Sequence, residues 1–196
     1  MIAYSIMNWK DPDQSRHHVE YGAEKNYYEG LDRSYKVKNA PFDSIEELLL
    51  VRDVDEDVYQ ILKNHITIFP KQGSLKINLD TASEKVLLSI ARAFSGKPTN
   101  TTMDDAKSLV TKMLAYRKGN DGLEATADDA QIDNSQMSLN SKENVLFAAM
   151  NSVRTKNSNY FKIQSIGKDL ERGIQTKIET TMHSNDLKIV YWKRYE

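Results

Sequence analysis

The sequence predicts an α+β protein in which a mainly helical domain comes first and a small antiparallel β-meander comes last. In roughly the first three quarters of the chain, apolar residues recur at helical spacing between polar loops. After about residue 158 the apolar period changes to two, which is typical of strands with one covered face. We therefore expect a helical domain over residues 1–157 and C-terminal strands over residues 158–196.

Two helix–turn–helix units are expected within the helical domain. Ser44-Ile45-Glu46-Glu47 and Thr81-Ala82-Ser83-Glu84 both match the capping box, in which a hydroxyl and a carboxylate satisfy the first backbone N–H groups of a helix. Each box is followed by a second helical pattern, over residues 58–62 and 103–117 respectively. The two units resemble SAM-like or helix-hairpin-helix modules, and residues 65–79 read as an extended connector between them.

Three further patterns complete the expected order of elements. Residues 1–9 have the spacing of the end of a helix, and residues 141–151 have that of a short helix. Alternating apolar residues predict three strands separated by turns at residues 167–173 and 184–186. Because three strands make a thin sheet, we expect a strand or a long helix of the parent protein upstream of this segment.

The composition excludes several functional classes. The chain has 196 residues, of which 39% are hydrophobic and 28% charged, with a net charge of −1. No global field would therefore attract nucleic acid or an anionic membrane. The absence of cysteine removes disulfides, thiolate nucleophiles and cysteine zinc sites. No apolar run reaches the ~20 residues of a membrane helix, and no signal peptide is recognisable.

No pattern of residues predicts catalysis. The sequence has no Gly-x-Ser-x-Gly elbow, no His-Glu-x-x-His and no glycine-rich phosphate loop. His17 and His18 are adjacent and their side chains should diverge, whereas His65 and His183 are isolated. We therefore expect a protein that is not an enzyme, although a hydrolase that uses calcium and paired carboxylates is kept as an alternative.

An acidic loop is the sharper of two candidate metal sites. Residues 118–140 are polar, and four carboxylates fall within nine residues around Gly122. These are Asp121, Glu124, Asp128 and Asp129. Calcium takes six to eight oxygen ligands from flexible loops of this kind. The spacing is not that of an EF-hand, so a solvated acidic loop remains an equal interpretation.

The opening segment, residues 8–28, is the second candidate metal site. Asp11, Asp13 and Glu24 lie there among Trp9 and several tyrosines. A cation could organise the carboxylates while the aromatic rings pack behind them. The alternative is an ordinary Asp-Pro-Asp turn on a solvated face.

Nucleic-acid binding by a helix-hairpin-helix module is the second alternative function. Such binding needs a glycine hairpin whose backbone N–H groups face a phosphate. The first hairpin here, residues 52–57, has no glycine and four acids, which would repel phosphate. We therefore expect no nucleic-acid partner.

Several short motifs occur in an order that matches a known family. They are Trp9-Lys10-Asp11-Pro12-Asp13, Gly22-Ala23-Glu24, Tyr27-Tyr28, Asn39 to Leu48, Ile77 to Ala82, and Tyr160-Phe161 leading into the strands. This ordered set resembles the minor pseudopilin K family of type II secretion (general secretion pathway protein K). The resemblance covers most of the chain, which would then be a soluble fragment lacking the hydrophobic N-terminal helix and first strand of the family.

The resemblance implies a role in assembly. A protein of this kind caps the tip of a periplasmic pseudopilus, binds the minor pseudopilins of the I and J types, and blocks further addition through its helical domain. It is anchored to the bacterial inner membrane only by the N-terminal helix, and the secreted cargo and the secretin are further candidate partners. The three C-terminal strands would be part of the pseudopilin sheet.

The resemblance also implies structural calcium in the helical domain. The first site would use Asp11, Asp13 and Glu24, and the loop site would use Asp121, Glu124, Asp128 and Asp129. Two departures from the family pattern are expected to matter. Asn8 stands where an aspartate is common, which removes a charge, and Ala125 stands where glycine is usual, which would strain a left-handed backbone.

Overall fold

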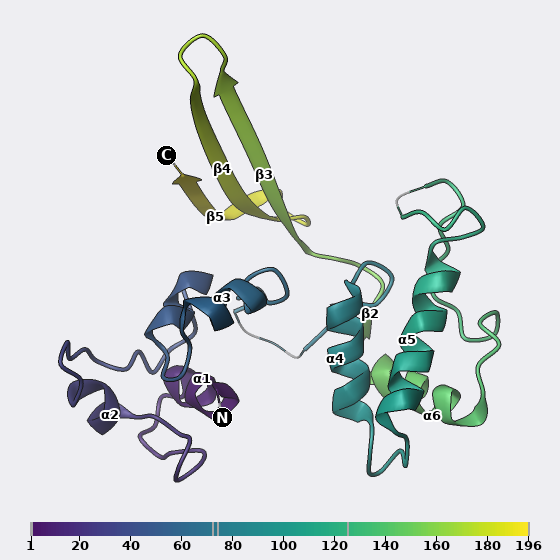
Figure 1. Cartoon of the computed structure of the whole chain (residues 1–196), viewed down its shortest axis with the longest axis horizontal. Coiled ribbons are helices and arrows are strands. Elements are labelled where there is room, and N and C mark those ends of the chain that lie inside the picture. The colour runs from purple at the N-terminus through teal and green to yellow at the C-terminus, as the bar shows by residue number, and fades with distance from the viewer. Residues whose placement is uncertain (1, 72, 74, 125, 196) are drawn as a thin grey trace. The chain divides into compact units, whose positions relative to one another are not determined.

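The computed structural model describes residues 2–71, 73, 75–124 and 126–195. The chain divides into two compact units, residues 1–73 and residues 74–196 (Figure 1). The boundary that the sequence predicts, between residues 157 and 158, falls between strands β2 and β3 and stays a prediction.

Unit 1 is built from four short helices and long connecting segments. Its elements are α1 (Ile2–Lys10), α2 (Lys25–Glu29), the 3-10 helix η1 (Ile45–Leu50) and α3 (Glu56–Leu62). Their buried side chains form one core cluster of Trp9, Ala23, Tyr28, Phe42, Leu48, Val51 and Val54. The aromatic residues of the opening segment therefore supply much of the core that these short helices share.

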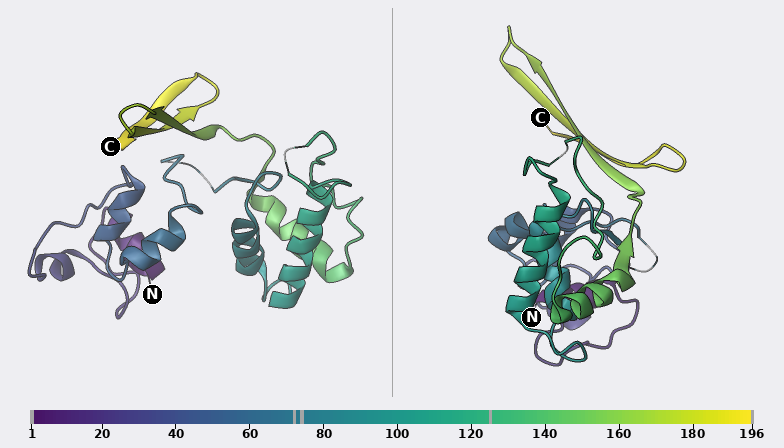
Figure 2. Two further views of the ribbon diagram at one scale, coloured as in Figure 1. Left: turned by 45° about the horizontal axis from the view of Figure 1, so that its top comes forward. Right: turned by 90° about the vertical axis from the view of Figure 1, so that its right-hand side faces the viewer.

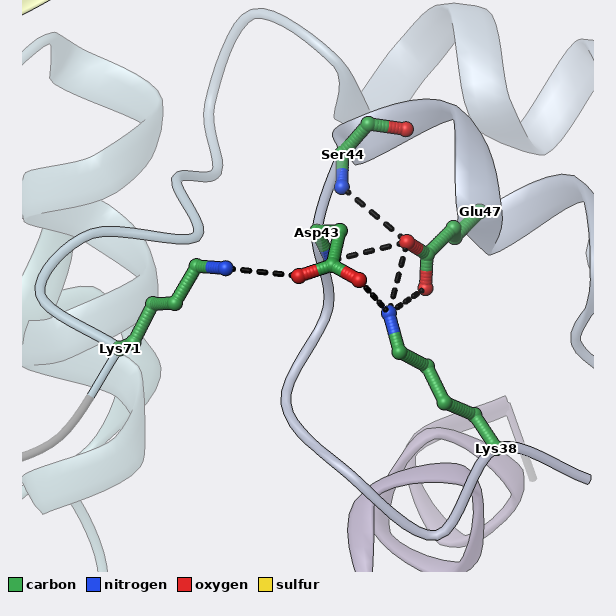
Figure 3. A network of polar contacts seen from close by, with 5 residues as sticks. All are labelled: Lys38, Asp43, Ser44, Glu47 and Lys71. Carbon is green, nitrogen blue, oxygen red and sulfur yellow. Dashed lines mark hydrogen bonds and ion pairs between the residues drawn. The ribbon is translucent and has the colours of Figure 1, made fainter. Parts of the chain in front are cut away.

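A network of charged side chains fixes the segment that enters η1 (Figure 3). Lys38 Nζ lies 2.7 Å from Asp43 Oδ2 and 2.8 Å from both oxygens of Glu47. Lys71 Nζ reaches Asp43 Oδ1 at 2.7 Å, and the Ser44 N–H donates to Glu47 Oε1 at 3.3 Å. Two lysines and Asp43 thus connect the loop before η1, η1 itself and the last residues of unit 1.

Unit 2 begins with three helices that share a core. They are α4 (Glu84–Phe94), α5 (Met103–Arg117) and α6 (Ser141–Met150), with a 3-10 turn η2 (Asn151–Val153) after α6. Each helix packs against the other two, and their buried faces meet in a cluster that includes Leu87, Leu109, Met113 and Leu146. The short strands β1 (Ile77–Asn78) and β2 (Arg154–Thr155) pair in parallel and so join the two ends of this helical part.

The last three strands form an antiparallel meander, as predicted. These strands, β3 (Tyr160–Asp169), β4 (Ile174–His183) and β5 (Lys188–Tyr195), pair in the order β3-β4-β5. Figure 2 shows them side by side as one twisted sheet. A register shift occurs in β4 between Thr181 and Met182.

Two local predictions are corrected by the structure. Residues 45–50 form a 3-10 helix and not an α-helix, which fits a segment of only six residues that ends at an extended Val51. The second capping box begins too early, because the N-cap of α4 is Ser83 and not Thr81. The N–H groups of Thr81 and Ala82 bond to the Asn78 carbonyl at 3.3 and 3.0 Å, which holds them in a turn before the helix.

The pairing of helices agrees with the predicted units only in outline. Helix η1 packs on α3, and α4 packs on α5. Helix α6 also packs on both α4 and α5, so the second predicted unit is part of a three-helix arrangement.

Candidate metal centre and assembly surface

Helix α1 positions the first candidate metal site. Trp9 is buried near the end of α1, and Asp11 and Asp13 follow directly after the helix. Asp11 Oδ1 accepts the Asp13 N–H at 3.2 Å, and Asp13 Oδ1 accepts the Ser15 N–H at 2.5 Å. The second oxygen of Asp11 lies 2.8 Å from His17 Nε2. The predicted Asp-Pro-Asp turn is therefore present, with both carboxylates turned toward local donors.

Glu24 is the buried member of this site. Its side chain is 6% exposed, and one carboxylate oxygen accepts a hydrogen bond from Asn8 Nδ2. The other oxygen, Oε2, is buried and has no hydrogen-bond partner among the described residues. Burial raises the pKa of Glu24, and the nearby charges of Asp11 and Asp13 raise it further, although the bond from Asn8 opposes them.

Aromatic rings lie behind the acidic segment. The ring centroids of Trp9 and Tyr28 are 5.2 Å apart in an edge-to-face arrangement, and Tyr35 lies 5.4 Å from Tyr28. The Tyr28 hydroxyl accepts the Arg52 N–H at 3.3 Å, and burial raises the pKa of Tyr28 to about 12. The packing of aromatic rings next to the acids, expected for the opening segment, is thus present.

The second candidate site lies on the loop between α5 and α6. Asp128 Oδ2 accepts the N–H groups of Asn120 and Asp121 at 2.7 and 3.2 Å. Asp128 and Asp129 both accept hydrogen bonds from the Thr126 hydroxyl, at 2.9 and 3.4 Å. These bonds lower the pKa of Asp128, with the Thr126 hydroxyl as the main cause. Asp128 and Asp129 therefore meet at Thr126, while Asp121 reaches this group through its backbone.

Glycine is required where this loop leaves α5. Gly119 has a φ of +62°, and a Cβ at this position would collide with Asp128. The close approach of Asp128 to the backbone thus depends on a residue without a side chain.

Glu124, the fourth predicted ligand of the loop, has a different partner. Its Oε1 lies 2.7 Å from Arg117 Nη2, and this hydrogen bond lowers its pKa. Arg117 is 7% exposed and also donates to the Ala82 carbonyl at 2.7 Å. Sequence reasoning missed Arg117, which a buried position at the end of an amphipathic helix could have indicated.

The residues present fit a cation better at the first site than at the loop. Over residues 2–71, 73, 75–124 and 126–195, no three acidic or histidine side chains gather closely enough to hold a metal ion as they stand. At the first site, however, a buried carboxylate oxygen of Glu24 has no hydrogen-bond partner in the described part of the chain, and such an atom is satisfied by an ion or a water. Ala125, whose replacement of glycine was expected to strain the loop, lies outside the described residues.

The meander has two chemically different faces. The register places Phe161 opposite Met182 and Ile189, and Ile163 opposite Thr180 and Trp192. The side chains of Phe161, Ile163, Ile189 and Trp192 are exposed, so this face is apolar and open in the described residues. The other face is polar, with Lys162 paired to Glu179 at 2.9 Å and two lysines next to Tyr195. An open apolar face of this kind is typical of an interaction surface.

Comparison with known proteins finds a family that matches the first part of the chain. Residues 1–71 match the family model described as "Type II secretion system (T2SS), protein K". A curated relative, the type II secretion system protein K of Aeromonas hydrophila, is 31% identical over 107 residues. Residues 1–71 are therefore similar to the type II secretion system protein K family. The resemblance predicted from the ordered motifs is therefore confirmed.

A solved structure supports the fold of this chain along its whole length. In the crystal structure of the GspK-GspI-GspJ complex from enterotoxigenic Escherichia coli, a chain 18% identical to this one matches it with a TM-score of 0.68. The match covers all of this chain and 62% of the solved chain. The match to the Aeromonas protein covers 55% of this chain and 31% of that protein. The α+β class expected from the sequence is confirmed.

None of the helices in the described residues has the length and apolarity that crossing a membrane requires.

Proposed function

We propose that the parent protein is a non-enzymatic assembly subunit of a type II secretion pseudopilus. It binds minor pseudopilins of the I and J types at the pseudopilus tip, where its helical units prevent another subunit from adding. In the full-length protein it works in the periplasm and is anchored to the inner membrane. The observation that carries this proposal is the family match over residues 1–71, supported by a fold match to a chain of the GspK-GspI-GspJ complex.

Co-purification of the full-length protein with its I and J pseudopilins tests this role. Recovery of a complex is expected, and failure to recover either partner would remove the proposal. Trp192→Glu places a charge on the apolar face of the meander, where the side chain is 56% exposed. Leu170→Glu is the matched control, because Leu170 is 89% exposed in the turn between β3 and β4. We expect the first variant to weaken the complex and the second to leave it unchanged.

We also propose that calcium stabilises unit 1 and the loop between α5 and α6. Asp11, Asp13 and Glu24 would hold the first ion, and Asp121, Glu124, Asp128 and Asp129 would hold the second. Such an ion would satisfy clustered carboxylates and replace part of the hydrophobic core that long segments lack. The buried Glu24 oxygen without a partner supports the first site. Glu124 would join the second only by exchanging Arg117 for the ion.

Thermal melts in EDTA, in millimolar calcium and in magnesium test the two sites. A ligand that binds only the folded state stabilises it by about 2.7 kcal/mol at a hundredfold excess over its dissociation constant. A calcium-selective rise of several degrees is expected. Glu24→Gln and Asp128→Asn then locate the ion, and identical melts in EDTA and calcium would remove the calcium proposal while leaving the assembly role untouched.

A further inference from the structure

Asn8 is a buried polar side chain that connects three separate stretches of unit 1. It is fully buried on α1, and its Nδ2 donates to the Ser15 carbonyl at 3.0 Å and to Glu24 Oε1. Its Oδ1 accepts the His17 N–H at 3.4 Å. One neutral amide thus holds the segment after α1 and the residue before α2.

The backbone around this amide is shaped to receive it. A Cβ at Gly22 would lie 2.7 Å from Asn8 Oδ1 and 2.7 Å from the His18 carbonyl oxygen. Both contacts are closer than a real Cβ makes, so only glycine allows the chain to pass here. The Gly22-Ala23-Glu24 sequence therefore brings the Glu24 carboxylate to Asn8 and not to solvent.

The two oxygens of Glu24 have different surroundings. Oε1 is occupied by the Asn8 amide, whereas Oε2 is buried without a hydrogen-bond partner in the part of the chain that the structure describes. An N–H donor stabilises a carboxylate without adding a positive charge. An aspartate at position 8 could not donate this bond and would place a second negative charge against Glu24.

We propose that Asn8 holds Glu24 in place at the first ion site while no ion is bound, a role that rests on the calcium binding proposed above. Its amide holds Glu24 by one oxygen and leaves the other for the ion. Because Asn8 is neutral, it holds Glu24 without adding a charge, and the site carries three acids where an aspartate would make four. Since the number of charged ligands tunes calcium affinity, the wild-type site binds calcium more weakly than an Asn8→Asp site, by roughly tenfold.

The experiment uses tryptophan fluorescence to follow unit 1 within the whole chain. The chain has two tryptophans, and Trp192→Phe leaves the buried Trp9 as the single reporter. In this background, wild type, Asn8→Asp, Glu24→Gln and the double variant are melted in EDTA and in calcium. Asn26→Asp is the matched control, because Asn26 is exposed on α2 two residues from Glu24.

In EDTA, Asn8→Asp is expected to lower the melting temperature of unit 1 by several degrees. Adding Glu24→Gln should recover most of that loss, because it removes the opposing charge and restores a donor. In calcium, Asn8→Asp should show the larger rise and a dissociation constant about tenfold lower. Asn26→Asp should behave like wild type in both media.

Two results would overturn the inference. Equal stability of wild type and Asn8→Asp in EDTA would show that the amide does not hold Glu24. A loss that Glu24→Gln fails to recover would reduce Asn8 to a packing residue. If calcium changed the melting temperature of neither wild type nor Asn8→Asp, the calcium proposal and the metal part of this inference would both fail. The comparison in EDTA would still decide whether Asn8 holds Glu24.

Discussion

Replacement of Glu143 by alanine should destabilise the helical part of unit 2 by about 3 kcal/mol. Glu143 is fully buried near the start of α6. Its carboxylate accepts hydrogen bonds from Ser108 Oγ at 2.6 Å, Lys112 Nζ at 2.7 Å and the Asn140 N–H at 2.7 Å. It therefore clamps the first turn of α6 onto the middle of α5.

The size of this loss of stability follows from the Lys112 charge, which loses its partner when the Glu143 carboxylate is removed. Removing one partner of a buried ion pair costs about 3–5 kcal/mol, mainly because the other charge loses its partner. The Lys112 side chain is 36% exposed and can turn to water, so the lower end of that range applies. At about 3 kcal/mol, the melting temperature should fall by roughly 6–12 °C.

Urea unfolding followed by far-UV circular dichroism measures this loss. Glu143→Gln keeps the volume and one acceptor, so it should lose roughly half as much. Asp104→Ala is the control, because the Asp104 side chain is 93% exposed in the first turn of α5. A surface change of this kind should stay within about 0.5 kcal/mol.

The pH dependence of the stability that Glu143 contributes provides a further check. Burial alone would raise the pKa of Glu143, but the bonds from Lys112 and Ser108 outweigh it and hold the pKa below its ordinary value. The stabilisation by Glu143 is therefore complete above the unfolded pKa and is lost as pH falls through the lowered value. If Glu143→Ala were no worse than Asp104→Ala at neutral pH, the clamp described here would be wrong.

Three other changes should have measurable effects. Arg154→Met removes two hydrogen bonds to Asp80, at 3.1 and 3.3 Å, and leaves that carboxylate without its cation. The free energy of unfolding measured in urea should fall by about 2–3 kcal/mol. A loss as small as that of Asp104→Ala would contradict this. Burial raises the pKa of Tyr28 to about 12, so stability should fall as pH rises from 10 toward 12. Tyr28→Phe should reduce this fall in alkaline melts, and Tyr35, whose pKa burial also raises, should account for part of what remains; an unchanged fall would contradict this. The hydrogen bonds from Lys38 and Lys71 hold the pKa of Asp43 at about 2. Lys71→Met should raise that pKa in an NMR titration, and an unchanged pKa would refute the contact between Asp43 and Lys71.

The sequence by itself determined the elements whose signals are local. Helix α5 spans residues 103–117 as its apolar spacing predicts, and the change of period near residue 160 marks the meander. A helix and a hairpin form bonds within a few residues along the chain, so their patterns can be read without the rest of the fold. The ordered motifs also sufficed to indicate the family.

Only the tertiary structure decided which residues act on the candidate sites. Glu24 meets Asn8 across 16 residues, Glu124 is taken by Arg117, and β1 pairs with a strand 77 residues away. Nothing in the spacing of the acids indicates these partners, because burial and pairing depend on segments that only packing brings together. The sequence therefore showed which segments are rich in carboxylates, whereas the fold decided which buried carboxylate oxygen has no hydrogen-bond partner among the described residues.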